Sequence, residues 1–76
     1  MLEGLQAADA PGAELTPREH EILTLLARGM SNGQIGRSLF IATKTASVHV
    51  SHILAKLGAS TRGEAVDVAR RKGLLP

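Results

Sequence analysis

Small hydroxyl side chains and a Lys gather in one short stretch, residues 43–51. Its polar members include Thr43, Lys44, Thr45, Ser47 and Ser51. A Lys ammonium pairs with phosphate groups, and hydroxyl groups hydrogen-bond both phosphate oxygens and the edges of bases. The chemistry that these residue types offer is the binding of a polyanion.

These side chains can act together only if one element presents them, and the spacing predicts a helix over residues 43–57 that ends at Gly58. Apolar residues recur there at the three-and-four spacing of a buried stripe. This stripe consists of Ala46, Val50, Ile53 and Leu57, with Leu54 beside it. The opposite face then carries Lys44, Ser47, Val48, Ser51 and Ala55. Val48 is apolar on this outer face; a lone exposed Val is common, but contact with a thymine methyl in a DNA groove would also account for it.

Two shorter helices are expected before this one. Thr16 can cap the first, Pro17 suits its first position, and Glu19 completes a capping box. Gly29 supplies a left-handed residue that ends it. The second helix begins with another capping box, formed by Ser31 and Gln34. Its Ile35 and Leu39 are expected to face inward, and a three-residue turn follows it.

A fourth helix is expected over residues 62–72. Thr61 and Glu64 have the spacing of a capping box, and the cations at residues 70–72 complement the negative end of the helix dipole. Ala65 and Ala69 permit close approach of another helix, in the core of the monomer or in a partner. The pattern predicts an all-α, four-helix fold whose second and third helices form a helix-turn-helix.

The whole chain has 76 residues, enough for one small domain, and it has no Cys. Its stability must therefore come from apolar packing. Residues 1–14 have no sustained periodicity and are interpreted as a flexible linker or an N-terminal stub, and residues 15–76 as the domain. No apolar run is long enough for a membrane span and no signal peptide is recognisable, so a cytoplasmic location without membrane contact is the default.

The net charge is only +2, but the charges are unevenly distributed. Between Glu21 and Glu64 the chain carries cations and no carboxylate: Arg28, Arg37, Lys44, Lys56 and Arg62. A surface of one sign attracts polyanions, which suits a nucleic-acid partner. A solvated face without a ligand is the alternative explanation of the same charges.

The sequence offers little for catalysis. It has no glycine-rich phosphate loop, no nucleophile elbow and no plausible pair of carboxylates, and a bundle of this size has no room for an enclosed pocket. His49 and His52 have i, i+3 spacing, but no Cys or carboxylate nearby in sequence completes a metal site. We therefore expect a domain that is not an enzyme and needs no metal or cofactor.

Motifs spread over residues 15–75 together resemble the LuxR-type (GerE, NarL/FixJ) helix-turn-helix DNA-binding domain of bacterial transcription regulators. The resemblance rests on residues 15–19, 31–35, 39–41, 44–45, 49–50, 53–54, 56–58 and 62–65. Because many residues match in order and spacing across four helices, the signal is strong. It implies that the helix over residues 43–57 reads the major groove of double-stranded DNA as the output domain of a regulator.

The resemblance also implies roles for particular residues. The positions that contact base edges in the family fall on Ser47, Val48 and Ser51. The positions that contact phosphates fall on Asn32, Lys44, Thr45 and Lys56. Arg62 and Glu19 also match family positions, and we expect an ion pair between them that ties the fourth helix to the first.

The chain departs from the family at several of these positions. Ser47 and Ser51 stand where Lys or Arg is frequent, so bidentate recognition of guanine is not available from them. Ala46 replaces a usual Val. Ala42 replaces a frequent Ser that caps the reading helix, so Thr43 is expected to serve as the cap instead.

The fourth helix is expected to pair two copies of the domain. The resemblance and the apolar run of this helix assign the contact to Ala65, Val66, Val68 and Ala69. A small contact of this kind predicts a weak homodimer that is stabilised on DNA, and RNA polymerase is a further candidate partner. A helical protein-interaction module that does not bind DNA remains the alternative, and the two differ in the salt dependence of binding.

Overall fold

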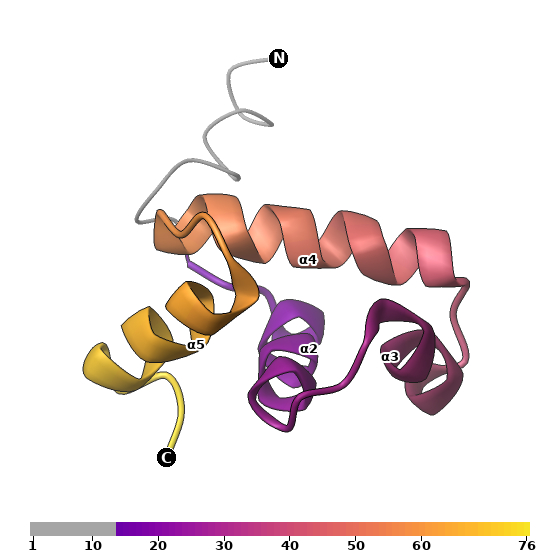
Figure 1. The fold of residues 1–76 in the computed structure, drawn as a ribbon, viewed down its shortest axis with the longest axis horizontal. Coiled ribbons are helices and arrows are strands. Elements are labelled where there is room, and N and C mark those ends of the chain that lie inside the picture. Colours follow the sequence, from indigo (N-terminus) through magenta and orange to yellow (C-terminus); the bar gives the residue numbers. More distant parts are fainter. Residues whose placement is uncertain (1–13) are drawn as a thin grey trace.

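The computed structural model describes residues 14–76, and this part of the chain contains four helices and no strand (Figure 1). They are α2 (Pro17–Ala27), α3 (Asn32–Leu39), α4 (Thr43–Leu57) and α5 (Arg62–Arg71). The all-α, four-helix prediction is confirmed, and α4 has the bounds that the sequence predicted. Apart from Glu14, the expected linker lies outside the described residues.

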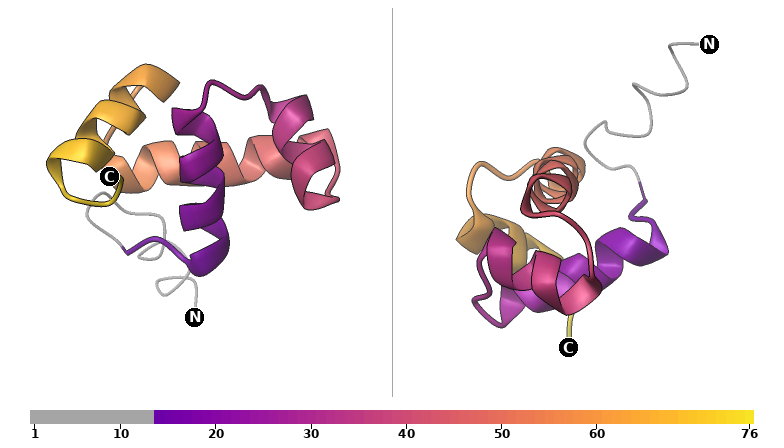
Figure 2. Two further views of the ribbon diagram at one scale, coloured as in Figure 1. Left: turned by 90° about the horizontal axis from the view of Figure 1, so that it is seen from below. Right: turned by 90° about the vertical axis from the view of Figure 1, so that its right-hand side faces the viewer.

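The longest helix, α4, forms one layer, and the other three helices pack along one side of it (Figure 1). The α3 helix lies at the beginning of α4 and α5 at its end, with α2 between them. Seen along α4, the three shorter helices leave its opposite side uncovered by any helix of the described part (Figure 2). This arrangement leaves one long face of α4 open.

The core is built from the inner faces of all four helices. Ile22 and Leu23 of α2, Ile35 of α3 and Ile53 of α4 are completely buried. The predicted stripe of α4 is confirmed, since Ala46, Val50, Ile53 and Leu57 are all buried. Burial of each large aliphatic side chain contributes about 1.5–3 kcal/mol relative to exposure, so these contacts fix which face of α4 points inward.

Side-chain caps begin three of the helices. Thr16 Oγ1 accepts from the Glu19 N–H at 3.1 Å while Glu19 Oε1 accepts from the Thr16 N–H at 2.9 Å, so the first predicted capping box is confirmed. The box of Ser31 and Gln34 is also confirmed. At α5, Thr61 caps as expected, but the carboxylate of Glu64 accepts from the N–H of Ser60 rather than from that of Thr61.

The expected cap at the beginning of α4 is wrong. The N-cap is Ala42, which makes no side-chain hydrogen bond, and Thr43 is already the first helical residue. The reason is that the Ala42 carbonyl accepts from the Ala46 N–H at 3.0 Å, which starts the helix one residue earlier than a Thr43 cap requires. The first amides of α4 therefore have no side-chain cap.

The turn between α3 and α4 depends on a close backbone approach at Gly36. Phe40 adopts a left-handed conformation (φ 59°, ψ 42°) and donates its N–H to the Gly36 carbonyl, as Ile41 does at 2.9 Å. A Cβ atom on Gly36 would lie only 2.7 Å from the Ile41 oxygen. The turn can fold back over α3 only because position 36 has no side chain.

Candidate nucleic-acid interface

The open face of α4 presents most of the residues that the sequence assigned to it. Lys44, Thr45 and Ser51 are exposed, and Ser47 is half-buried. Val48 is 47% exposed, which confirms its unusual outward position. The polar side chains and Val48 come from the first three turns of α4, opposite the buried stripe, because helical periodicity separates the two faces.

The three candidate base-contacting residues form one small patch. Ser47 and Ser51 are four residues apart and Val48 and Ser51 three apart, so all three project from the same side of the helix. Each hydroxyl can donate and accept, and the Val side chain offers methyl groups. This patch has no cation, so it can recognise a base edge by single hydrogen bonds and by apolar contact but not by a bidentate clamp.

Cations and free amides lie at the beginning of α4. Lys44 and Thr45 are exposed there, next to the uncapped N-terminus of the helix. A methyl group added at Gly33 would lie 3.7 Å from Arg37 Nη1 and 3.9 Å from Thr43 Oγ1, which places the exposed Arg37 close to the same turn. The positive end of the helix dipole and two cations thus occupy one region.

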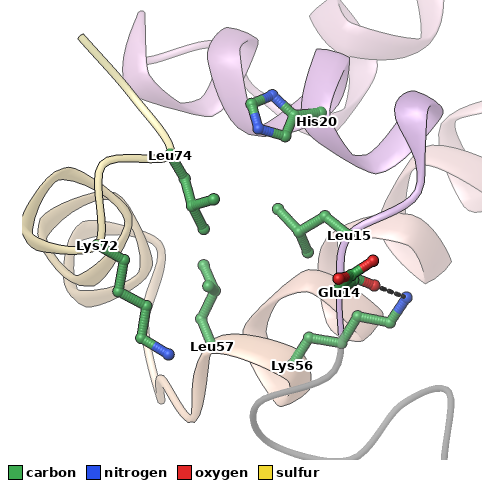
Figure 3. Close-up of a pocket in the computed structure, with 7 residues that line it drawn as sticks. All are labelled: Glu14, Leu15, His20, Lys56, Leu57, Lys72 and Leu74. Carbon is green, nitrogen blue, oxygen red and sulfur yellow. Dashed lines mark hydrogen bonds between the residues drawn. The ribbon is translucent and has the colours of Figure 1, made fainter.

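The structure corrects the expectation for Lys56. Its side chain is only 4% exposed, and its ammonium lies 2.6 Å from Glu19 Oε1. It also lies 3.2 Å from the carbonyl oxygen of Glu14 (Figure 3). The ammonium therefore faces α2 and the chain that leads into it rather than solvent. A buried and paired ammonium of this kind is not available to contact a phosphate.

The expected ion pair between Arg62 and Glu19 is also wrong, because Lys56 occupies the carboxylate. Arg62 instead donates to the Met30 carbonyl at 3.1 Å and to the side-chain oxygen of Asn32. Asn32 is half-buried, and its oxygen points toward α5. Only the amide nitrogen of its side chain is left to donate to a phosphate.

The four residues expected to pair two copies of the domain differ in burial. Ala65 and Ala69 are completely buried in the core of the monomer, so their side chains have no exposed surface that could contact a partner. This corrects their assignment, since the small side chains serve the close packing of α5 within one chain. Val66 and Val68 are half-buried and also pack against the core.

Electrostatics at the Lys56 pair favour the ionised carboxylate. Burial by itself would raise the pKa of Glu19, but hydrogen bonds from the Lys56 ammonium and the Thr16 N–H, together with the positive charge of Lys56, hold it below the ordinary value of a Glu side chain. Glu19 is therefore charged at neutral pH. Local spacing did not predict this pair, because Glu19 and Lys56 are 37 positions apart in the sequence.

Two helices joined by a tight turn, with the second presenting an open polar face, define the helix-turn-helix class of DNA-binding domains. The model of the bacterial regulatory proteins of the luxR family (GerE) matches residues 13–69. The chain belongs to this family, whose members are DNA-binding transcription regulators and not a class of enzymes.

Curated relatives support the same family. The chain is 46% identical over 65 residues to the transcriptional regulatory protein LiaR of Bacillus subtilis, which covers 86% of this chain and 31% of LiaR. It is 41% identical over 59 residues to a putative HTH-type transcriptional regulator of Mycobacterium bovis, Mb0914c, which covers 78% of this chain and 7% of that protein. The chain thus spans less than a third of either relative.

Solved structures agree in fold. The transcription factor GerE superposes with a TM-score of 0.75 at 42% identity, covering 82% of this chain and 92% of that one. The response regulator ChrA of a heme-sensing two-component system gives a TM-score of 0.79 at 40% identity, covering 92% of this chain and 35% of ChrA. Within residues 14–76, no helix is both long enough and apolar enough to span a membrane.

Proposed function

We propose that this domain binds double-stranded DNA with α4 in the major groove and is the output domain of a longer bacterial transcription regulator. The observation that supports the proposal best is the open face of α4, which combines hydroxyls, Lys44 and an exposed Val opposite a buried apolar stripe. Because bacterial chromosomal DNA lies in the cytoplasm, we propose that the protein is cytoplasmic. A regulatory portion elsewhere in the longer protein and RNA polymerase are the partners proposed beside DNA.

Sequence reading is proposed for Ser47, Val48 and Ser51. Val48 would contact a thymine methyl, and the two hydroxyls would bond base edges that accept or donate. Because none of the three is a cation, discrimination between sites is modest. Much of the affinity then comes from phosphates, which gives a Kd on the order of 10⁻⁴ to 10⁻⁶ M at physiological salt.

Phosphate binding is proposed for the beginning of α4 and its surroundings. Lys44 and Thr45 would contact the backbone together with the free amides of the first turn, and the Asn32 amide group would contribute from α3. Arg37 joins this group because its guanidinium lies near the same turn. Lys56 is not included.

Substitutions at Lys44 and Val48 test the two roles. Lys44→Ala should weaken binding to all duplexes alike and lower the salt slope by about one unit, whereas Val48→Ala should change the preference among duplexes with the slope retained. Binding to a panel of DNA duplexes at several salt concentrations measures both quantities. Arg71→Ala, which removes an exposed cation at the far end of α5, is the control and should leave the site preference unchanged.

The same titration decides between DNA binding and the protein-interaction alternative. Displacement of counterions from DNA makes affinity fall steeply with salt, while an apolar helix contact responds little. An affinity of the unmodified domain that does not change with salt would refute the proposed function. Equal effects of Val48→Ala on every duplex would remove Val48 from the base-reading patch.

A further inference from the structure

One buried ion pair joins three segments that are distant in sequence. Lys56 Nζ donates to Glu19 Oε1 at 2.6 Å and to the carbonyl of Glu14 at 3.2 Å. Glu19 Oε1 accepts in turn from the N–H of Thr16 at 2.9 Å. The last turn of α4, the first turn of α2 and segment 14–16 thus share one hydrogen-bonded network, which we call the Lys56 clasp (Glu14, Thr16, Glu19 and Lys56).

Leu15 packs against the hydrophobic core beside the clasp. It lies between Glu14 and Thr16, whose backbone groups take part in the network. Its side chain points toward Leu57 and Leu74 across a hollow of about 410 Å³ (Figure 3). Leu57 follows Lys56 on α4. The polar network and the apolar side chains around this hollow therefore lie at the same end of α4.

Stability alone does not explain why charges are buried here. Taking two ions out of water has a large desolvation cost, and apolar pairs of similar volume often stabilise a fold as well or better. A charge-assisted hydrogen bond, however, fixes distances and angles that an apolar contact leaves free. The clasp is better explained by the geometry that it imposes on α4.

The geometry of the last turn of α4 bears on the open face. Ser51 is five residues before Lys56, and Val48 is eight residues before it, on one continuous helix. The helix rises 1.5 Å per residue and moves as a rod over such a length, so a tilt or rotation at Lys56 displaces both side chains. Residues that never touch DNA can therefore set how the patch meets a groove.

We infer that Lys56 is a positioning residue for DNA reading: through the clasp it sets the orientation at which α4 presents Val48 and Ser51. This inference rests on the proposed function. It differs from a phosphate contact because the Lys56 ammonium bonds Glu19 and Glu14 inside the fold and the side chain is only 4% exposed.

A double variant removes the clasp without leaving a buried charge. Glu19→Gln together with Lys56→Met deletes both charges, and an amide at position 19 still accepts from the Thr16 N–H, so the capping box is kept. The matched control is Asp67→Asn with Arg71→Met. It deletes the exposed 3.3 Å ion pair of α5 and makes the same changes in charge.

Each variant is compared with the unmodified domain on a library of randomised duplexes and by titration at several salt concentrations. The double variant should lose affinity for the duplexes preferred by the unmodified domain by about threefold to tenfold. It should prefer a different set of duplexes, and its salt slope should not change. The control should stay within about twofold, because exposed pairs contribute little. Amide NMR spectra of the same samples verify that both variants are folded.

Two results would overturn the inference. A salt slope lower by about one unit would mean that Lys56 contacts a phosphate after all. Unchanged affinity and preference in the folded double variant would mean that the pair only packs the core. By contrast, an unmodified domain without salt-dependent DNA binding would refute the proposed function itself.

Lys56→Arg gives a second test if the double variant does not fold. A guanidinium keeps the charge but is a planar fork that cannot replace a single ammonium between two acceptors. This variant should change the preference among duplexes with the salt slope retained, and preference identical to that of the unmodified domain would count against positioning by Lys56.

Discussion

At the scale of single residues, Glu19 has two structural roles. One oxygen of its carboxylate closes the capping box with Thr16 and also receives the ammonium of Lys56. Both contacts favour the charged form, and together they outweigh the burial that opposes it, so the pKa of Glu19 lies below its ordinary value. A single oxygen thus links a helix cap to the contact between two helices.

The lowered pKa predicts how stability depends on pH. Glu19 is charged more readily in the folded than in the unfolded chain, so its contribution is complete above the ordinary Glu pKa and is lost as pH falls through the folded value. The free energy of unfolding, measured by urea titration, should therefore decrease from about pH 5 downward. Glu19→Gln should show a weaker decrease over this range, whereas Glu21→Gln, which removes an exposed carboxylate of α2, should not. Parallel curves for Glu19→Gln and the unmodified domain would contradict the assignment.

At the scale of elements, the α3–α4 turn determines where α4 begins. Gly36 lets the backbone of residues 40–42 fold against α3, and this contact sets the start of α4 at Thr43. The requirement is steric, since any Cβ on Gly36 would meet the Ile41 carbonyl. Gly33, on the same helix, has no such neighbour, because the nearest atom to an added Cβ is 3.7 Å away.

These two glycines give a matched pair of substitutions. Gly36→Ala should destabilise the domain by about 1–3 kcal/mol, because the turn must shift to accept the methyl group. Gly33→Ala should be neutral or stabilise by up to about 1 kcal/mol, because a helical Ala loses less backbone entropy on folding. Chemical denaturation of both variants measures the difference. Equal effects of the two substitutions would show that the close approach at Gly36 is not what constrains the turn.

At the scale of the whole molecule, we propose that two copies of the domain pair through the surface of α5. With Ala65 and Ala69 in the core, Val66 and Val68 remain as the apolar part of the proposed contact. Val66→Asp should abolish cooperative binding of a second copy to DNA with two half-sites while the affinity for one half-site is kept. Sedimentation with and without DNA measures this. Loss of binding to a single half-site as well would show that Val66 belongs to the monomer core.

Local patterns predicted most of the fold. The bounds of α4, the two capping boxes and the buried stripe follow from neighbours within four residues, and such contacts can be inferred from sequence spacing. For the same reason the outward position of Val48 was predicted. The exposed face of α4 could therefore be assigned before the structure was known.

Contacts between distant residues could not be predicted in this way. Lys56 and Arg62 look like surface cations in the sequence, yet one is buried against α2 and the other bonds the loop before α3. The partner of Glu19 depends on how α2 packs against both α4 and α5. Sequence spacing within one helix does not reveal this packing. The same packing decided that Ala65 and Ala69 face inward. The surface cations of the helix-turn-helix are consequently fewer than the sequence suggested.

The aliphatic core has a spectroscopic consequence. The chain has no Trp or Tyr, and its single Phe, Phe40, is 94% exposed in the α3–α4 turn. No Phe, Tyr or Trp ring therefore lies within the core described here, and the domain has no intrinsic tryptophan fluorescence. Phe40→Trp would place a fluorophore in the turn that leads into α4 without disturbing any buried side chain. Its emission would then report on the surroundings of the α3–α4 turn alone.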